Sequence, residues 1–321
     1  MEVEVTVAGN LLCEYEALRQ GTGAYRLPVD VVAVRGRDAT SYLQGQLSQD
    51  VAPLGVGSSA PSLLLEPDGK LAALVRVTRA GDDSYVLDTD EGFGALVAAR
   101  LQRFKLRTKV DIEQVAWSCV SLRGGGTAPA AVRTEAPFAL AVDWNGTRGV
   151  DLLGPVPGAL EAEVPPDATW CGAAAWEALR IEAGIPKMGA ELDARTIAAE
   201  ADLVVRTVSF TKGCYTGQEL VARLDARGSR VARRLRGIVA GDAGPEEAAL
   251  LVGASLWAPE GDRVVGRCTS ASWCPGLGKL GALAYVHRSV QDASSVVWAA
   301  EEDAPPGDRR PAEARPLPLV G

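Results

Sequence analysis

The order of apolar and polar residues predicts alternating strands and helices over the first hundred positions. Residues 30–35 (DVVAVR) are rich in β-branched side chains, which is typical of a strand. Asp38 follows, and from there apolar residues recur at helical spacing as far as Leu47. Asp is a common helix N-cap, so this pattern predicts a helix that Asp38 caps. Residues 93–104 repeat the helical spacing and predict a second helix.

A β-hairpin is predicted between these two helices. Two apolar runs, 63–65 and 71–77, flank residues 66–70 (EPDGK). In such a turn Pro fixes φ and Gly accepts a positive φ, which lets the chain reverse its direction. Short strands are expected at 85–87 and 109–115. Antiparallel strands mixed with helices indicate an α+β fold rather than a doubly wound one.

The middle of the chain contains one clear helix and a less regular region. Residues 176–183 are amphipathic and are followed by Gly184, which predicts a helix that ends there. Residues 131–165 are expected to form strands, with a turn at 144–146 (WNG). Residues 123–129 (RGGGTAP) predict a flexible loop.

The C-terminal part of the chain predicts a small β-barrel. Short apolar runs separated by Gly and Pro lie at 236–239, 255–258, 263–269 and 281–286. From residue 300 onward five prolines mingle with charged residues, which predicts a disordered tail. We therefore expect four parts: a leading arm (1–24), an α+β region of two subdomains (25–235), the barrel (236–299) and the tail (300–321).

Composition excludes several classes of protein. The 321 residues include 33 basic and 41 acidic side chains, a net charge of −8, and 47% of them are hydrophobic. These values indicate a folded globular protein and disfavour wholesale nucleic-acid binding. The single histidine, His287, follows a predicted strand, and we expect it to take no part in catalysis.

The spacing of the cysteines and the length of the apolar runs indicate whether the protein has a metal site and where in the cell it is expected. Six cysteines are present, but no two of them form a CxxC pair, which argues against a zinc ribbon or an iron–sulphur ligand run. We therefore expect no metal site. The chain starts with acidic residues and has no uninterrupted run of about 18 apolar residues. We expect a cytoplasmic protein without a membrane contact, in which the thiols are reduced.

The segment from 210 to 236 carries the most distinctive chemistry. Thr216 followed by Glu219 has the spacing of a capping box and predicts a helix from about residue 217. Cys214 lies just before that predicted helix end, with Lys212 two residues upstream. A helix N-terminus and a nearby cation both favour the thiolate. From the residues alone, Cys214 is either an accessible thiol of lowered pKa or a buried structural cysteine.

The same segment ends in a run of arginines. A single acid, Asp225, opposes six of them, which gives a local charge of +5 in an acidic protein. The arginines are Arg223, Arg227, Arg230, Arg233, Arg234 and Arg236. Two interpretations remain open: a site for a polyanion such as a polyglutamyl tail, a phosphate or an RNA backbone, or a solvated charged surface.

Residues 212–223 (KGCYTGQELVAR) resemble the signature K-G-C-Y-x-G-Q-E-x-V-A-R of the YgfZ family. These are folate-binding proteins of iron–sulphur cluster assembly and repair, related to the T-protein (aminomethyltransferase) of glycine cleavage. Three further segments are similar to the family's motifs: 34–50 (VRGRDATSYLQGQLSQD), 65–71 (LEPDGKL) and 180–192 (RIEAGIPKMGAEL). The resemblance covers residues 28–290 in the family's order.

The resemblance implies a T-protein-like three-domain ring with mixed and antiparallel sheets and a small C-terminal β-barrel. Its central cavity would bind tetrahydrofolate or a related folate. Glu182 matches the family's glutamate that contacts the pterin, and a carboxylate suits the N–H donors of an aminopyrimidinone. Without the resemblance, we would expect Glu182 to be exposed on a helix and paired with Arg180 or Lys187.

Further site residues follow from the same motif. The resemblance implies that Cys214 is the functional thiol, with Lys212 beside it. Arg223 matches the family's arginine near the cavity and is a candidate partner for a folate carboxylate or a phosphate. Tyr215 and Gln218 are the other two motif residues expected to bind the folate.

The function implied is that of a folate-binding accessory protein for the assembly or repair of iron–sulphur clusters in client enzymes. One cysteine cannot hold a cluster alone, so a client or assembly protein is the expected partner. A folate-dependent one-carbon transferase is the alternative, and whether the chain is a conventional enzyme stays open. Asp88 and Asp90 are its candidate bases, although the spacing matches neither to the T-protein's catalytic aspartate. A role in tRNA modification would be indirect, without direct nucleic-acid binding.

Overall fold

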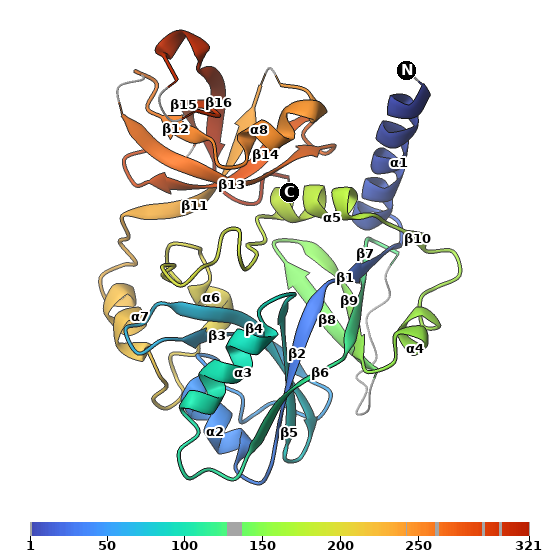
Figure 1. The fold of residues 1–321 in the computed structure, drawn as a ribbon, viewed down its shortest axis with the longest axis vertical. Helices are drawn as coiled ribbons and strands as arrows, with labels where there is room; N and C mark the ends of the chain where they lie inside the picture. The colour runs from blue at the N-terminus through green and yellow to red at the C-terminus, as the bar shows by residue number, and fades with distance from the viewer. Residues whose placement is uncertain are drawn as a thin grey trace.

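The structure, a computed structural model, describes residues 2–126, 137–241, 243–260, 263–290, 293–301 and 304–320. Within these residues the strands form two five-stranded sheets and one closed barrel. In Figure 1 the barrel lies at the top and the two open sheets lie below it. This mixture of helices, antiparallel sheets and a barrel confirms the predicted α+β class.

The first sheet has the strand order β3-β4-β5-β2-β6, and all of its pairs are antiparallel. Its elements are β2 (Val29–Arg35), β3 (Ser59–Leu65), β4 (Leu71–Gly81), β5 (Ser84–Asp90) and β6 (Asp111–Val115), with helices α2 (Ala39–Gln46) and α3 (Gly94–Arg103). The predicted hairpin is confirmed, because Leu65 pairs with Leu71 and Gly69 has a φ of 84°.

Asp38 stands at the N-cap of α2 but makes no hydrogen bond to the helix through its side chain. Its Oδ2 accepts the backbone N–H of Lys109 at 2.7 Å. The predicted side-chain cap is therefore wrong, because the carboxylate instead ties the start of α2 to the segment that precedes β6.

The second sheet has the order β10-β1-β7-β9-β8, and only the β1–β10 pair is parallel. Its elements are β1 (Gly23–Leu27), β7 (Ser118–Arg123), β8 (Phe138–Trp144), β9 (Thr147–Gly154) and β10 (Thr169–Trp170), with α4 (Pro157–Glu161) between β9 and β10. The predicted turn is confirmed, since Asn145 and Gly146 both have positive φ. Part of the predicted loop and of the expected strands, residues 127–136, lies outside the described residues.

Two helices pack against each other beside this sheet. They are α1 (Glu2–Arg19), which makes up most of the predicted leading arm, and α5 (Ala173–Ala183). Tyr15 and Leu18 share a buried cluster with Leu179. α5 ends at Gly184, which has a φ of 68°, as the sequence predicts.

The predicted C-terminal barrel is confirmed. It closes in the order β11-β14-β13-β12-β15-β16. Its strands are β11 (Arg233–Ala240), β12 (Ser255–Trp257), β13 (Val264–Cys274), β14 (Lys279–His287), β15 (Ser294–Ala299) and β16 (Arg310–Arg315). Three short helical turns accompany them: η1 (Pro245–Glu247), α8 (Ala248–Leu251) and η2 (Pro306–Asp308).

The last barrel strand corrects the prediction of a disordered tail over residues 300–321. β16 pairs with both β11 and β15 and closes the barrel. Its alternate residues Ala312 and Ala314 pack into the barrel core, while the charged Glu313 stands between them. The short strand is hard to see in the sequence because its inward residues are small. The domain boundaries themselves stay predictions.

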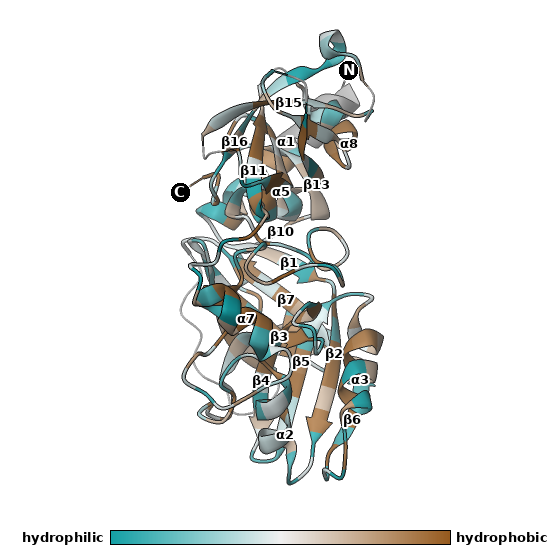
Figure 2. Ribbon diagram, turned by 90° about the vertical axis from the view of Figure 1, so that its left-hand side faces the viewer, coloured by the Kyte–Doolittle hydropathy of each residue, from teal (hydrophilic) through white to brown (hydrophobic). Residues whose placement is uncertain are grey.

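One buried core links the first sheet to the barrel. It includes Leu87 of β5, Ile181 of α5 and Leu283 of β14, and segments 188–208 contribute further members. Figure 2 shows the apolar strands of the lower sheets, with polar residues on α3 and α7 (Gln218–Asp225). Across the described residues, every helix is too short or too polar to span a membrane.

Candidate functional site

The motif segment, residues 212–223, starts helix α7 without the predicted side-chain cap. The N-cap is Gly217, with a φ of 82°, and no side chain caps the helix. Thr216 instead donates its backbone N–H to the Gly45 carbonyl at 3.1 Å. The predicted capping box is therefore wrong, because a left-handed glycine rather than a threonine side chain turns the chain into the helix.

Two glycines allow α7 to dock on the turn of the β3–β4 hairpin. A Cβ at Gly217 would lie 2.6 Å from the carbonyl oxygen of Glu66. A Cβ at Gly69 would lie 2.4 Å from the Cβ of Leu220. Side chains at either position would collide with the opposite element. Two motifs far apart in the sequence are thus in direct contact.

Lys212 closes the end of α2. Its Nζ donates to three carbonyl oxygens, those of Gln44 at 2.6 Å, Leu47 at 2.7 Å and Gln49 at 3.0 Å. Burial lowers the pKa of Lys212 to about 8. An ammonium group has three donors, so all of them are directed at this helix end rather than at Cys214. Lys212 therefore fixes the motif to α2, a role that the motif spacing alone did not show.

Cys214 lies on the surface between these two anchors. It is exposed, which agrees with the accessible alternative and contradicts the buried structural one. α7 begins four residues later, at Gln218, so the thiol is not at the first turn of the helix. The proposed role of Cys214 stays a prediction.

The other motif residues lie around Cys214 in different environments. Tyr215 is buried, and burial raises its pKa to about 12. The side-chain oxygen of Gln218 accepts the backbone N–H of Tyr215 at 3.2 Å, so Gln218 stabilises its own turn. Arg223 is exposed in the last turn of α7.

Glu182 is fully buried rather than exposed, so the expectation of a surface ion pair is wrong. Its carboxylate accepts the hydroxyl of Tyr15 and the backbone N–H of Gly276, the latter at 3.0 Å. Arg180 pairs with Glu191 instead, at 2.9 Å. Burial raises the pKa of Glu182, and its hydrogen bonds oppose that shift. Tyr15 was not found from the sequence, because its helix contacts α5 more than 150 positions away.

The arginine run is divided by the fold. Arg233 pairs with Glu200 at 3.1 Å and lies over the ring of Tyr285. Arg234 donates to the carbonyl of Ser229 at 2.7 Å. Arg223, Arg227 and Arg230 are exposed at α7 and the loop after it. The run is therefore not one continuous basic surface.

A cavity of about 220 Å³ lies where β11 meets the rest of the molecule. Its lining comes from the β8–β9 turn, the end of α5, residues 201–206, β11 and residues 316–317. Three arginines and one acid line it: Arg206, Arg234, Arg236 and Asp202. Sequence reasoning identified the two β11 arginines but not Arg206, which lies about thirty positions earlier on α6 (Val204–Thr207).

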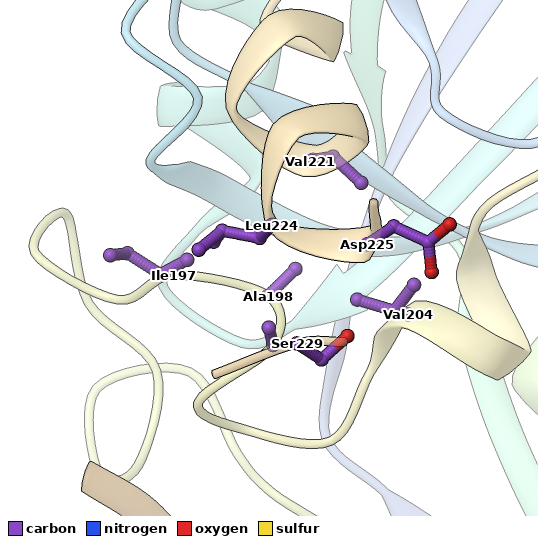
Figure 3. Close-up of a pocket in the computed structure, with 8 residues that line it drawn as sticks. Ile197, Ala198, Val204, Val221, Leu224, Asp225 and Ser229 are labelled. Carbon is purple, nitrogen blue, oxygen red and sulfur yellow. The ribbon is translucent and has the colours of Figure 1, made fainter. Parts of the chain in front are cut away.

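A second hollow lies under α7 (Figure 3). Val221 and Leu224 of the helix lie over Ile197 and Ala198, and Asp225 lies beside Val204 of α6. The space is too narrow for a water molecule. It is a packing seam between α7 and the segment before α6.

The two candidate bases are held in structural interactions. Asp88 is buried and pairs with Arg76 at 2.9 Å, and Arg76 also pairs with Asp151 at 2.6 Å. Oδ2 of Asp90 accepts the backbone N–H of Met188 at 2.9 Å. Burial raises the pKa of both Asp88 and Asp90. Arg76 of β4 therefore joins Asp88 of β5 to Asp151 of β9, and so links the first sheet to the second.

Comparison with known proteins gives matches in sequence and in fold. No family model matches the chain. A tRNA-modifying protein YgfZ from Enterobacter sp. is 28% identical over 246 residues, covering 66% of this chain and 72% of that protein. An aminomethyltransferase from Corynebacterium jeikeium is 24% identical over 324 residues, covering 87% of this chain and 82% of that protein.

A solved structure supports the fold. The glycine cleavage system aminomethyltransferase T from Bartonella henselae superposes with a TM-score of 0.79 over 97% of this chain and 89% of its own, at 21% identity. At that identity the likeness concerns the fold. Sequence and fold together confirm the predicted resemblance of this chain to YgfZ proteins and to their aminomethyltransferase relatives.

Proposed function

We propose that this chain is a folate-binding accessory protein of the YgfZ type, which assists the assembly or repair of iron–sulphur clusters in client enzymes. Cys214 is its functional thiol, and a tetrahydrofolate is its ligand. The similarity to YgfZ proteins and the aminomethyltransferase fold support the proposal. The observation that carries it is the exposure of Cys214 between two fixed anchors.

These anchors make the thiol suited to a partner. Lys212 holds the segment to α2 on one side, and Gly217 holds it to the hairpin turn on the other. A fixed, exposed thiol meets an incoming client in one orientation, without the entropy cost of ordering a loop. Because one thiolate cannot ligate a cluster alone, the remaining ligands come from the client or an assembly protein.

An acceptor, Glu182, suits the pterin end of a folate, and arginine donors suit its glutamyl end, while the cavity has room for one end only. Glu182 offers a carboxylate for the pterin, although Tyr15 and Gly276 now donate to it and would have to give way. The arginine-lined cavity of about 220 Å³ holds roughly seven water volumes, below the ~300 Å³ at which drug-sized pockets begin. A folate supplies one-carbon and redox chemistry when bound, and the residues of this chain would hold and orient it.

Folate binding is tested by calorimetric titration of tetrahydrofolate into the protein. We expect saturable binding that weakens at least tenfold in Glu182→Gln, since the amide offers one acceptor where the carboxylate offers two. The matched control is Glu177→Gln on the same helix, because Glu177 pairs with Arg180 and not with Tyr15. Absence of binding in the wild-type protein would contradict the folate part of the proposal.

A one-carbon transferase is the second candidate, and the aminomethyltransferase fold favours it. Asp90 is then the base to test, because Asp88 is committed to its ion pair with Arg76. Formation of methylenetetrahydrofolate from an aminomethyl donor, lost in Asp90→Asn, would establish that activity.

The name of the YgfZ relatives points to tRNA, and we propose that any such effect is indirect. Arg233 and Arg234 already bond to Glu200 and Ser229 within the protein. Salt-dependent binding of tRNA that disappears in the R233A/R234A variant would contradict this view.

A further inference from the structure

The cavity beside β11 concentrates positive charge. Arg206 reaches it from α6, and Arg234 and Arg236 reach it from β11. Residues two apart on a strand point to the same face, which brings the β11 pair together. Asp202 is the one acid among the lining residues, so the lining carries a net charge of +2.

Two arginines of this cavity, Arg206 and Arg234, donate to neutral oxygens. Arg206 donates to the carbonyl of Asp143 at 3.2 Å and to the side-chain oxygen of Asn145, and Arg234 donates to a carbonyl. Within the part of the chain that the structure describes, neither Arg206 nor Arg234 forms an ion pair with a carboxylate. A guanidinium has five N–H donors, so donors remain for a ligand.

The end of the chain forms one wall of the same cavity. We call residues 316–320 the C-terminal strap, and its Pro316 and Leu317 line the cavity. Leu319 donates its N–H to the carbonyl of Glu182 at 2.7 Å. Leu317 packs on Gly184, where a Cβ would lie 2.8 Å from its side chain. The strap thus bounds the cavity on the side of α5.

We propose that this cavity binds a small dianion, with Arg206, Arg234 and Arg236 as its partners and the C-terminal strap as its wall. The charge of +2 matches two carboxylates or one phosphate, and guanidinium groups bind either bidentately. The volume of about 220 Å³ suits a group of that size rather than a whole cofactor. One source, the two carboxylates of a folate's terminal glutamate, rests on the proposed function. The other source is a free dianion.

The test is calorimetric titration of inorganic phosphate and of N-acetyl-L-glutamate, whose nitrogen is an uncharged amide as in a folate, into the wild-type protein and into R206Q and R234Q. We expect one of the two ions to bind and its affinity to fall by about tenfold or more in each variant, because a charge-assisted pair is lost. The matched control is R230Q, since Arg230 is exposed and outside the cavity lining. R234K serves where R234Q does not fold, because it keeps the charge but removes the planar fork.

Tetrahydrofolate and tetrahydropteroate distinguish the two possible sources of the dianion. If the cavity takes the glutamyl end, R234Q weakens tetrahydrofolate but leaves tetrahydropteroate, which lacks the glutamate, unchanged. If the cavity takes a free dianion, phosphate or N-acetyl-L-glutamate binds, and the affinities for tetrahydrofolate and tetrahydropteroate are both unaffected by R234Q. Wild-type affinity for both ions and both folates in R206Q and R234Q would overturn the inference. If tetrahydrofolate still bound in that case, the proposed function would stand without it.

Discussion

At the scale of single residues, buried polar groups decide where the motif elements lie. Lys212 and Glu182 both belong to recognisable motifs, yet in the structure each first serves to join elements. Lys212 satisfies three carbonyls at the end of α2. Glu182 joins α1, through Tyr15, to the turn at Gly276. The motifs predicted that Lys212 and Glu182 belong to the site. They did not predict the hydrogen-bond partners, because those partners come from distant parts of the chain.

Replacing Lys212 by Met is expected to lower the free energy of unfolding by about 1–3 kcal/mol, because three partly buried carbonyls lose their donor. Lys70→Met is the matched control, since the Lys70 side chain pairs with Asp68 at the surface and its loss is expected to stay within about 0.5 kcal/mol. Urea unfolding of both variants measures the difference. Equal effects would mean that Lys212 does not anchor the segment.

Glu182 predicts a dependence of stability on pH. Burial raises its pKa in the folded protein above the ordinary 4.5. The folded state then holds the proton more tightly than the unfolded state, so this stabilising contribution is complete below about pH 4 and is lost as the pH rises through the raised pKa. The Glu182→Gln variant has no carboxyl at this position and therefore lacks this pH-dependent contribution to stability. The free energy of unfolding of the variant should therefore increase relative to that of the wild type as the pH rises from 4 to 7. A constant difference over that range would contradict a raised pKa of Glu182.

At the scale of elements, sequence patterns correctly predicted the turns and helix ends that depend on residues within the element itself. The hairpin, the end of α5 at Gly184 and the turn at Gly146 each depend on a glycine of positive φ within the element itself. The pattern failed for β16, whose place in the barrel depends on pairing with β11, some seventy positions earlier. It failed for the capping box because Gly217 is held by contact with the hairpin turn rather than by a side-chain cap.

The contact between α7 and the hairpin is tested by Gly217→Ala. A left-handed alanine costs about 1 kcal/mol, and at this position its Cβ would also lie 2.6 Å from a carbonyl oxygen. Gly228→Ala is the matched control, because Gly228 has a φ of 70° but open space around its Cβ position. Thermal unfolding should show a clearly larger loss for G217A than for G228A. A similar loss in both would indicate that the close approach is unimportant.

At the scale of the whole molecule, the resemblance predicted a T-protein-like fold, and the superposition on an aminomethyltransferase confirms it. The predicted site residues are not gathered in one place by contacts. Cys214 lies on the surface, whereas Glu182 is buried beneath the turn at Gly276. The arginine cavity has walls from five separate segments, so no single stretch of sequence predicts it.

The most direct test of the central claim is rescue of a [4Fe–4S] enzyme's activity in cells that lack this protein. Cys13 and Cys214 are both exposed, so Cys13→Ser is a matched control for Cys214→Ser. We expect C214S to fold and to bind tetrahydrofolate as wild type does, yet to restore no enzyme activity, while C13S restores it fully. Full rescue by C214S would show that the exposed thiol is not the functional group.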